Sequence, residues 1–248
     1  MQKLRRIVSI SFLFCLSIIG VNAQQHPDQT WISANQQFEQ GDYSTAILAY
    51  QSIPDFEKKP KVLYNLGNAY FQSGQLGRAI LNFERAYRLA PSDKEIKHNL
   101  AVAKAKIQNP YSDTSFFLKR WWIQIFSVFS PNVWAVMLWL LALLLAFAFA
   151  WRKKKSFAKW ALPLFAVLFI LIASVLYLGL NTIQSKNDAI VLQNLQQYFS
   201  DPNLSETIDR FIPEGTQIKI LESKEGAVRF QLPNGVIGYL NPTLIEKI

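Results

Sequence analysis

The sequence predicts a mainly α-helical membrane protein that ends in a small β-barrel. Three observations support this fold class. Residues 133–151 and 160–180 form two apolar runs without a charged side chain, and residues 60–93 have the spacing of a helical hairpin. Residues 187–248 contain short runs of β-branched and aromatic residues between turn signals. Helices and strands are therefore expected in separate parts of the 248-residue chain.

The chain opens with the features of a secretory signal peptide, residues 1–23. Basic residues near the start precede an apolar stretch, and Val21-Asn22-Ala23 supplies a small-residue cleavage site. An uncleaved signal acting as a third anchor is the alternative. The single cysteine, Cys15, lies inside this segment, so the mature chain is expected to lack thiol chemistry and disulfides.

Residues 24–108 contain an internal repeat with an offset of 33 residues, visible where Gly41 recurs as Gly74. The better copy, residues 60–93, has small and aromatic residues at fixed offsets: Leu66, Gly67, Tyr70, Gly74, Ala79, Phe83, Ala86 and Pro91. This pattern resembles the tetratricopeptide repeat. The resemblance implies two helical hairpins, the first and looser one at about 27–59, followed by a closing helix from Lys94 to Ile107.

Tetratricopeptide arrays bind partners in a groove lined by the first helix of each hairpin. The resemblance assigns that groove to nine residues: Trp31, Asn35, Phe38, Tyr64, Asn68, Phe71, Gln72, His98 and Asn99. A clamp for a terminal carboxylate would need cations where Trp31 and Glu95 stand, so a peptide or a neighbouring helix is the expected ligand. The alternative is that the aromatic residues only stack one repeat on the next.

The middle of the chain predicts two membrane spans. An aromatic linker, residues 109–132, is expected at the membrane interface or, alternatively, as a core helix under the repeats. Residues 133–151 and 160–180 each approach the roughly 20 apolar residues that a span needs, a buried hairpin being the alternative. The loop between them, residues 152–159, carries five cations: Arg152, Lys153, Lys154, Lys155 and Lys159.

Short basic loops stay in the cytoplasm. This predicts a bacterial inner-membrane protein with two spans and with both flanking domains in the periplasm. The formal net charge of +9 fits this picture, because +5 falls in the predicted hairpin while residues 24–113 carry +1 and residues 181–248 carry −2. A nucleic-acid-binding protein would need a basic face on one of those domains, so nucleic acid is not an expected partner.

Residues 187–248 predict five short strands and resemble bacterial SH3-like domains. The resemblance rests on Glu214-Gly215-Thr216 before the second strand and on Gly238-Tyr239-Leu240 near the end. A candidate binding surface follows from its aromatic residues, which are Tyr198, Phe199 and Tyr239. The alternative is that these three side chains belong to the core.

The order of signal, tetratricopeptide repeats, two spans and SH3-like tail resembles the BatE family of the Bacteroides aerotolerance operon. The resemblance implies an adaptor in an envelope complex linked to oxidative stress tolerance. Its expected partners are the other membrane proteins of that operon, which carry von Willebrand A domains. The alternative function is a sensor or anchor that binds peptidoglycan through the SH3-like tail.

An enzyme is not expected. The sequence has no nucleophile–base pairing or phosphate loop, and the two histidines, His26 and His98, lack companion metal ligands. We therefore expect no cofactor and no metal. A channel or transporter subunit is disfavoured because the two apolar runs contain no charged residue.

Overall fold

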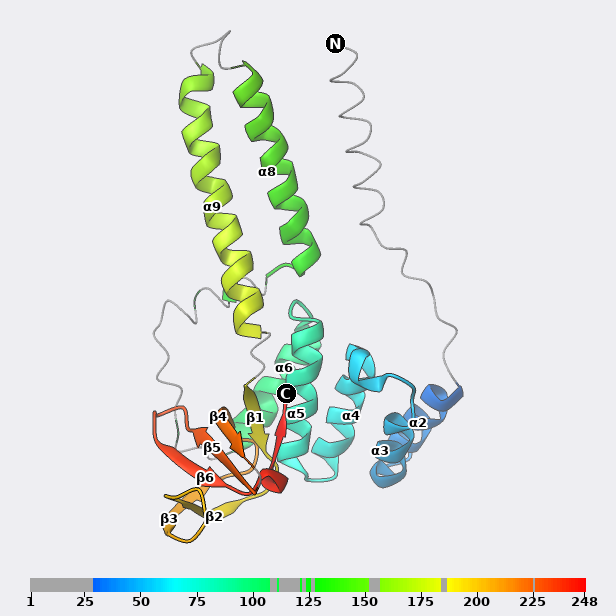
Figure 1. Ribbon diagram of the computed structural model, residues 1–248. Helices are drawn as coiled ribbons and strands as arrows, with labels where there is room; N and C mark the ends of the chain where they lie inside the picture. The colour runs from blue at the N-terminus through cyan, green and yellow to red at the C-terminus, as the bar shows by residue number, and fades with distance from the viewer. Residues whose placement is uncertain are drawn as a thin grey trace. The chain divides into compact units, whose positions relative to one another are not determined.

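The computed structural model describes residues 29–107, 111, 121, 124–125, 128–151, 157–183, 187–224 and 226–248. They fall into two compact units (Figure 1). One contains helices α8 (Pro131–Trp151) and α9 (Phe157–Ile183), and the other contains the helical repeat together with a β-sheet. Outside the described residues lie the predicted signal, most of the aromatic linker, the cations Arg152, Lys153, Lys154 and Lys155, and the side chain of Lys159.

Five helices form the repeat region. They are α2 (Gln29–Glu39), α3 (Tyr43–Gln51), α4 (Pro60–Gln72), α5 (Leu76–Leu89) and α6 (Lys94–Lys106), with the short 3-10 helix η1 (Phe56–Lys58) before α4. Gly41 and Gly74 both turn the chain between the two helices of a hairpin with φ of 81°, a left-handed conformation that glycine adopts without steric cost. This equivalence explains their spacing of 33 residues.

Close packing inside the second hairpin depends on Gly67 in α4. A Cβ atom at this position would lie 2.7 Å from the ring of Phe83 in α5, so only glycine lets the ring sit against the α4 backbone. Gly67 therefore allows the two helices of this hairpin to approach closely. Asp93 is the N-cap of the closing helix α6. Its side chain accepts hydrogen bonds from the backbone N–H groups of Glu95 and Ile96.

The C-terminal residues form one seven-stranded antiparallel sheet in the order β3-β2-β6-β5-β4-β1-β7. The strands are β1 (Asp188–Val191), β2 (Leu195–Phe199), β3 (Thr207–Ile212), β4 (Gln217–Lys224), β5 (Ala227–Gln231), β6 (Ile237–Leu240) and β7 (Ile245–Lys247), with 3-10 helix η2 (Pro242–Leu244) before β7. The five strands expected from sequence were too few. Two of the strands, β2 and β3, lie in the polar stretch after Gln193, where the sequence had indicated a loop.

Helix α5 and strand β1 join the repeat to the sheet through a shared core. Ile190 of β1 is fully buried in the same apolar cluster as Ile80 of α5, and Leu192 packs against that cluster. A Cβ atom on Gly77 would lie 2.8 Å from the backbone oxygen of Val191, which shows how closely the two elements approach. The repeat and the sheet are therefore one packed body.

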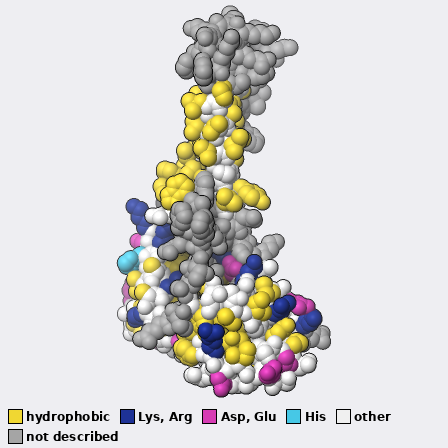
Figure 2. All heavy atoms as spheres, turned by 90° about the vertical axis from the view of Figure 1, so that its left-hand side faces the viewer, with side chains coloured by type: hydrophobic (Ala, Val, Ile, Leu, Met, Phe, Trp, Pro, Cys, Tyr) yellow, Lys and Arg dark blue, Asp and Glu magenta, His cyan; other side chains and the backbone are white. Residues whose placement is uncertain are grey.

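The membrane part of the predicted fold class is wrong: among the residues described, no helix is both long enough and apolar enough to cross a membrane. A span takes about 20 consecutive apolar residues. The structure describes the side chains of α8 up to Phe147 and those of α9 from Pro163 to Leu178, and neither stretch meets the requirement. Apolar side chains are exposed along both helices (Figure 2). The fold is a helical repeat region with a seven-stranded antiparallel sheet.

Candidate functional site

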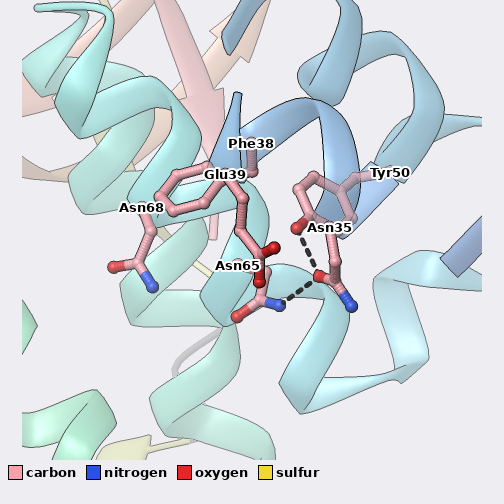
Figure 3. A pocket seen from close by; sticks show the side chains of 6 residues that line it. All are labelled: Asn35, Phe38, Glu39, Tyr50, Asn65 and Asn68. Atoms are coloured by element: carbon pink, nitrogen blue, oxygen red, sulfur yellow. Dashed lines mark hydrogen bonds between the residues drawn. The ribbon is translucent and has the colours of Figure 1, made fainter. Parts of the chain in front are cut away.

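A hollow of about 320 Å³ lies between the first helices of the two hairpins. It is lined by Asn35, Phe38, Glu39, Tyr50, Asn65 and Asn68, and Figure 3 shows these side chains together. Five of them come from the last two turns of α2 and the middle of α4, and Tyr50 reaches in from α3. The sheet does not cover this side of the repeat, because β1 packs against α5.

Asn35 is the centre of a hydrogen-bonded cluster in this hollow. The hydroxyl of Tyr50 donates to Asn35 Oδ1 over 2.6 Å, and Asn65 Nδ2 donates to the same oxygen over 3.0 Å (Figure 3). A carbonyl oxygen has two lone pairs, so both are used. The amide NH2 group of Asn35 is the part of the side chain that stays available to a ligand.

The same arrangement recurs one repeat later around Asn68. Asn99 Nδ2, from α6, donates to Asn68 Oδ1 over 2.8 Å and to the hydroxyl of Tyr64 over 3.0 Å. Asn68 accepts a hydrogen bond from Asn99 of the next helix just as Asn35 accepts one from Asn65. An asparagine ladder therefore connects the first helices of successive hairpins, and in each rung the amide oxygen accepts and the amide NH2 remains.

Charge differs between the two ends of this surface. Burial raises the pKa of the Tyr50 hydroxyl above its usual 10.0, and the negative charge of Glu39 adds to the rise. At the other end, the Lys106 ammonium of α6 lies 4.2 Å from the centre of the Phe71 ring, within cation–π range. The surface that runs from α2 across α4 to α6 thus carries an acidic residue, Glu39, at its α2 end and a basic one, Lys106, at its α6 end.

The structure brings together part of the predicted groove. Asn35, Phe38 and Asn68 line the hollow. Tyr64 and Asn99 belong to the second rung of the asparagine ladder. Gln72 and His98 are exposed. The aromatic residues also fill space between helices, as their partly buried state against the repeat core shows; these are Trp31, Phe38, Tyr64 and Phe71.

Sequence reasoning missed Glu39, Tyr50, Asn65 and Lys106. One sequence signal could have found Asn65, because it precedes Asn99 by the length of one repeat, as Asn35 precedes Asn68 by nearly the same distance. Tyr50 could not be found in this way, because the equivalent position of the next hairpin holds Phe83, which has no hydroxyl.

On the sheet, the three predicted surface residues separate into two groups. Tyr198 was expected on a binding surface, but it is 2% exposed and packs edge-on against Phe230 in the core, with ring centres 5.6 Å apart. Phe199 and Tyr239 lie opposite each other on β2 and β6 and are half-buried. Alternation along β2 explains the split, because neighbouring residues of a strand face opposite sides.

Within the part of the chain that the structure describes, no three His, Cys, Asp or Glu side chains come close enough together to hold a metal ion.

Comparison with known proteins agrees with the geometry of the second hairpin. The family model for the tetratricopeptide repeat matches residues 60–93, which are α4, α5 and the turn that follows. This chain therefore contains a tetratricopeptide repeat, a module that typically mediates protein–protein interactions and is not catalytic. A search of curated proteins finds no match to the chain.

Proposed function

We propose that this protein is a non-enzymatic adaptor that binds an extended segment of a partner protein across α2, α4 and α6. The observation that supports this most is the asparagine ladder. The hydrogen bonds found among the described residues use the oxygens of Asn35 and Asn68 and leave both NH2 groups for a ligand. Two donors at equivalent positions suit a ligand that presents acceptors at a regular interval, such as backbone carbonyl groups.

Geometry favours an extended ligand over a helical one. Asn35 on α2 and Asn65 on α4 are hydrogen-bonded to each other, and Asn68 lies one turn further along α4, so a ligand that reaches both Asn35 and Asn68 crosses from one helix to the other. A polyproline-II segment advances ~3.1 Å per residue and repeats every three residues. Carbonyl groups three residues apart therefore lie on one side of such a segment and can face successive donors of the ladder. A helical ligand would use its carbonyl groups internally.

The sides of the groove add selectivity. Half-buried Phe38 and Phe71 provide apolar contact at the ends of α2 and α4. Glu39 favours a basic ligand residue near α2, and Lys106 favours an acidic one near α6. These opposite charges would fix the direction in which the segment binds.

The resemblance to the BatE family supports a particular class of partner. It suggests a component of an envelope complex, including proteins with von Willebrand A domains, and a role in tolerance of oxidative stress. The signal-like residues 1–23 support export of the repeat from the cytoplasm.

The test uses Asn35→Asp combined with Asn68→Asp. This change keeps the oxygen that accepts the internal hydrogen bond and replaces the donating NH2 with a second, charged acceptor. Peptides selected from a random display library on the full chain are then measured by fluorescence anisotropy. We expect the double variant to weaken binding by about tenfold or more, since a carboxylate there repels ligand carbonyl groups.

The matched control is Gln75→Glu, which makes the same amide-to-carboxylate change on an exposed residue in the turn before α5. It should bind the selected peptides like the wild type. Equal binding by the double variant and the wild type would disprove the proposed use of the ladder.

A further inference from the structure

A second site lies on the sheet, where four residues from four strands form one row. Glu222 of β4 stands opposite Arg229 of β5, Arg229 stands opposite Tyr239 of β6, and Tyr239 stands opposite Phe199 of β2. Directly opposed residues have Cβ atoms about 4.5 to 5.5 Å apart. The strand neighbours Val228, Leu240 and Tyr198 face the core, so the row occupies the other face of the sheet.

Part of this row lines a small hollow of about 50 Å³. Its lining residues are Pro202, Glu222, Lys224, Ala227, Arg229 and Tyr239. Two of the charges neutralise each other, because Lys224 Nζ and Glu222 Oε1 form an ion pair at 2.9 Å. The hydrogen bond that the Lys224 ammonium donates to the Glu222 carboxylate raises the pKa of Lys224.

Arg229 is the group that the protein itself leaves unsatisfied. Its Nε atom is buried and, among the described residues, has no hydrogen-bond partner. The carboxylate directly across from it, Glu222, is bound to Lys224 instead. A buried donor without a partner is energetically costly, and Arg229 lines the hollow, so a ligand acceptor bound there would satisfy this side chain.

We propose that this hollow binds a carboxylate group carried by a peptide. The N–H groups of a guanidinium match the two oxygens of a carboxylate. Arg229 lines the hollow, and its Nε has no hydrogen-bond partner among the described residues. The Tyr239 ring and Pro202 provide apolar walls for the carbon atoms next to the carboxylate. The negative charge of Glu222 at the rim disfavours a dianion such as phosphate. The hollow lies on the sheet and is independent of the groove between α2 and α4.

The test measures binding of a fluorescein-labelled alanine tripeptide with a free C-terminal carboxylate to the full chain, beside the same peptide as its C-terminal amide. The free acid should bind and the amide should bind much more weakly. Arg229→Gln should weaken binding of the acid by about tenfold or more, because it removes a charged hydrogen bond. Glu222→Gln should strengthen binding of the acid, because the substitution removes the negative charge of Glu222 and frees the Lys224 ammonium from its ion pair.

Opposite effects of these two variants cannot come from unfolding, which would weaken binding in both. Lys219→Gln is the matched control, since it removes an exposed cation from β4 outside the hollow. Asn35→Asp with Asn68→Asp should leave tripeptide binding unchanged, which separates this site from the groove. Equal binding of acid and amide, or wild-type binding by Arg229→Gln, would overturn the proposal.

A parallel arm identifies where the carboxylate comes from. Purified peptidoglycan sacculi are sedimented with the wild-type chain and with Arg229→Gln. Sedimentation of the wild type alone supports the proposal with the carboxylates of the stem peptides as ligand. Binding of the tripeptide without sedimentation supports it with a protein as the source, and binding of neither probe overturns it.

Discussion

Arg88 of α5 and Asp188 of β1 form an ion pair, with Nη2 and Oδ2 3.2 Å apart, across 100 residues of sequence. Both side chains are mostly buried, with 16% and 18% of their surfaces exposed. A second guanidinium nitrogen of Arg88 donates to the backbone oxygen of Ile248 over 3.0 Å. The Arg88 side chain thus binds Asp188 of the first strand, β1, and Ile248, the residue that follows the last strand, β7.

We expect Arg88→Gln to lower the free energy of unfolding by about 2 kcal/mol, because it leaves a largely buried Asp188 without its counter-charge. Urea denaturation followed by circular dichroism measures this. Lys58→Gln breaks the exposed ion pair with Asp55 and should leave the free energy of unfolding essentially unchanged. Equal effects of the two substitutions would contradict the structural role of Arg88.

Glu214 makes a second link between the sheet and the repeat. Its carboxylate accepts a hydrogen bond from the backbone N–H of Gly77 over 3.0 Å, at the N-terminus of α5. A negative charge is stabilising there, so Glu214→Gln should cost roughly 0.3–1 kcal/mol. The loss should shrink in high salt. Glu57→Gln, on an exposed residue of η1, is the control and should be neutral.

Gly67→Ala tests the packing inside the tetratricopeptide hairpin. The added methyl group would collide with the Phe83 ring, so a loss of about 1–3 kcal/mol is expected in thermal or urea denaturation. Phe83→Leu should recover part of this loss when combined with Gly67→Ala, because it removes the ring that collides. Additive effects in the double-mutant cycle would show that the two positions do not interact.

Tyr50→Phe tests the ladder through the pH dependence of stability. Burial raises the folded-state pKa of Tyr50 above the usual 10.0, so the folded protein holds this proton more tightly than the unfolded chain does. The corresponding stabilisation is present below pH 10 and is lost as the pH rises through the folded-state pKa.

Urea denaturation at pH 8 to 11 should therefore show a shallower alkaline loss in Tyr50→Phe than in the wild type. At pH 8 the variant should be less stable by about 1 kcal/mol, because Asn35 loses one hydrogen bond. Tyr43→Phe is the control for loss of a hydroxyl outside the hollow. Parallel curves for the wild type and Tyr50→Phe would contradict the burial of this hydroxyl.

The second hairpin could be predicted from the sequence because its contacts are local. Gly67 packs against Phe83 of the next helix and Gly74 turns the chain between these two helices, so their spacing records the geometry of one hairpin directly. The strands β2 and β3 could not be predicted in the same way. They are short and polar on one face, β2 also pairs with the distant strand β6, and the pattern within each one does not distinguish it from a loop.

The membrane prediction rested on two apolar runs and on the basic loop between them, both read from the sequence. Residues 133–151 and 160–180 satisfy a count of uncharged residues in sequence. Within the described parts of α8 and α9, no stretch has both the length and the apolarity that crossing a membrane requires.

The sequence by itself determined the tetratricopeptide hairpin and the asparagines that it places on α2, α4 and α6. Only the tertiary structure decided which atoms of those asparagines remain for a ligand, that Ile190 of the sheet completes the core of the repeat, and that the buried Nε of Arg229 has no hydrogen-bond partner among the described residues. The reason is physical. Helix spacing is fixed by neighbours a turn or a hairpin away, whereas a hydrogen-bond partner or a shared core depends on chain segments about 30 to 100 residues distant.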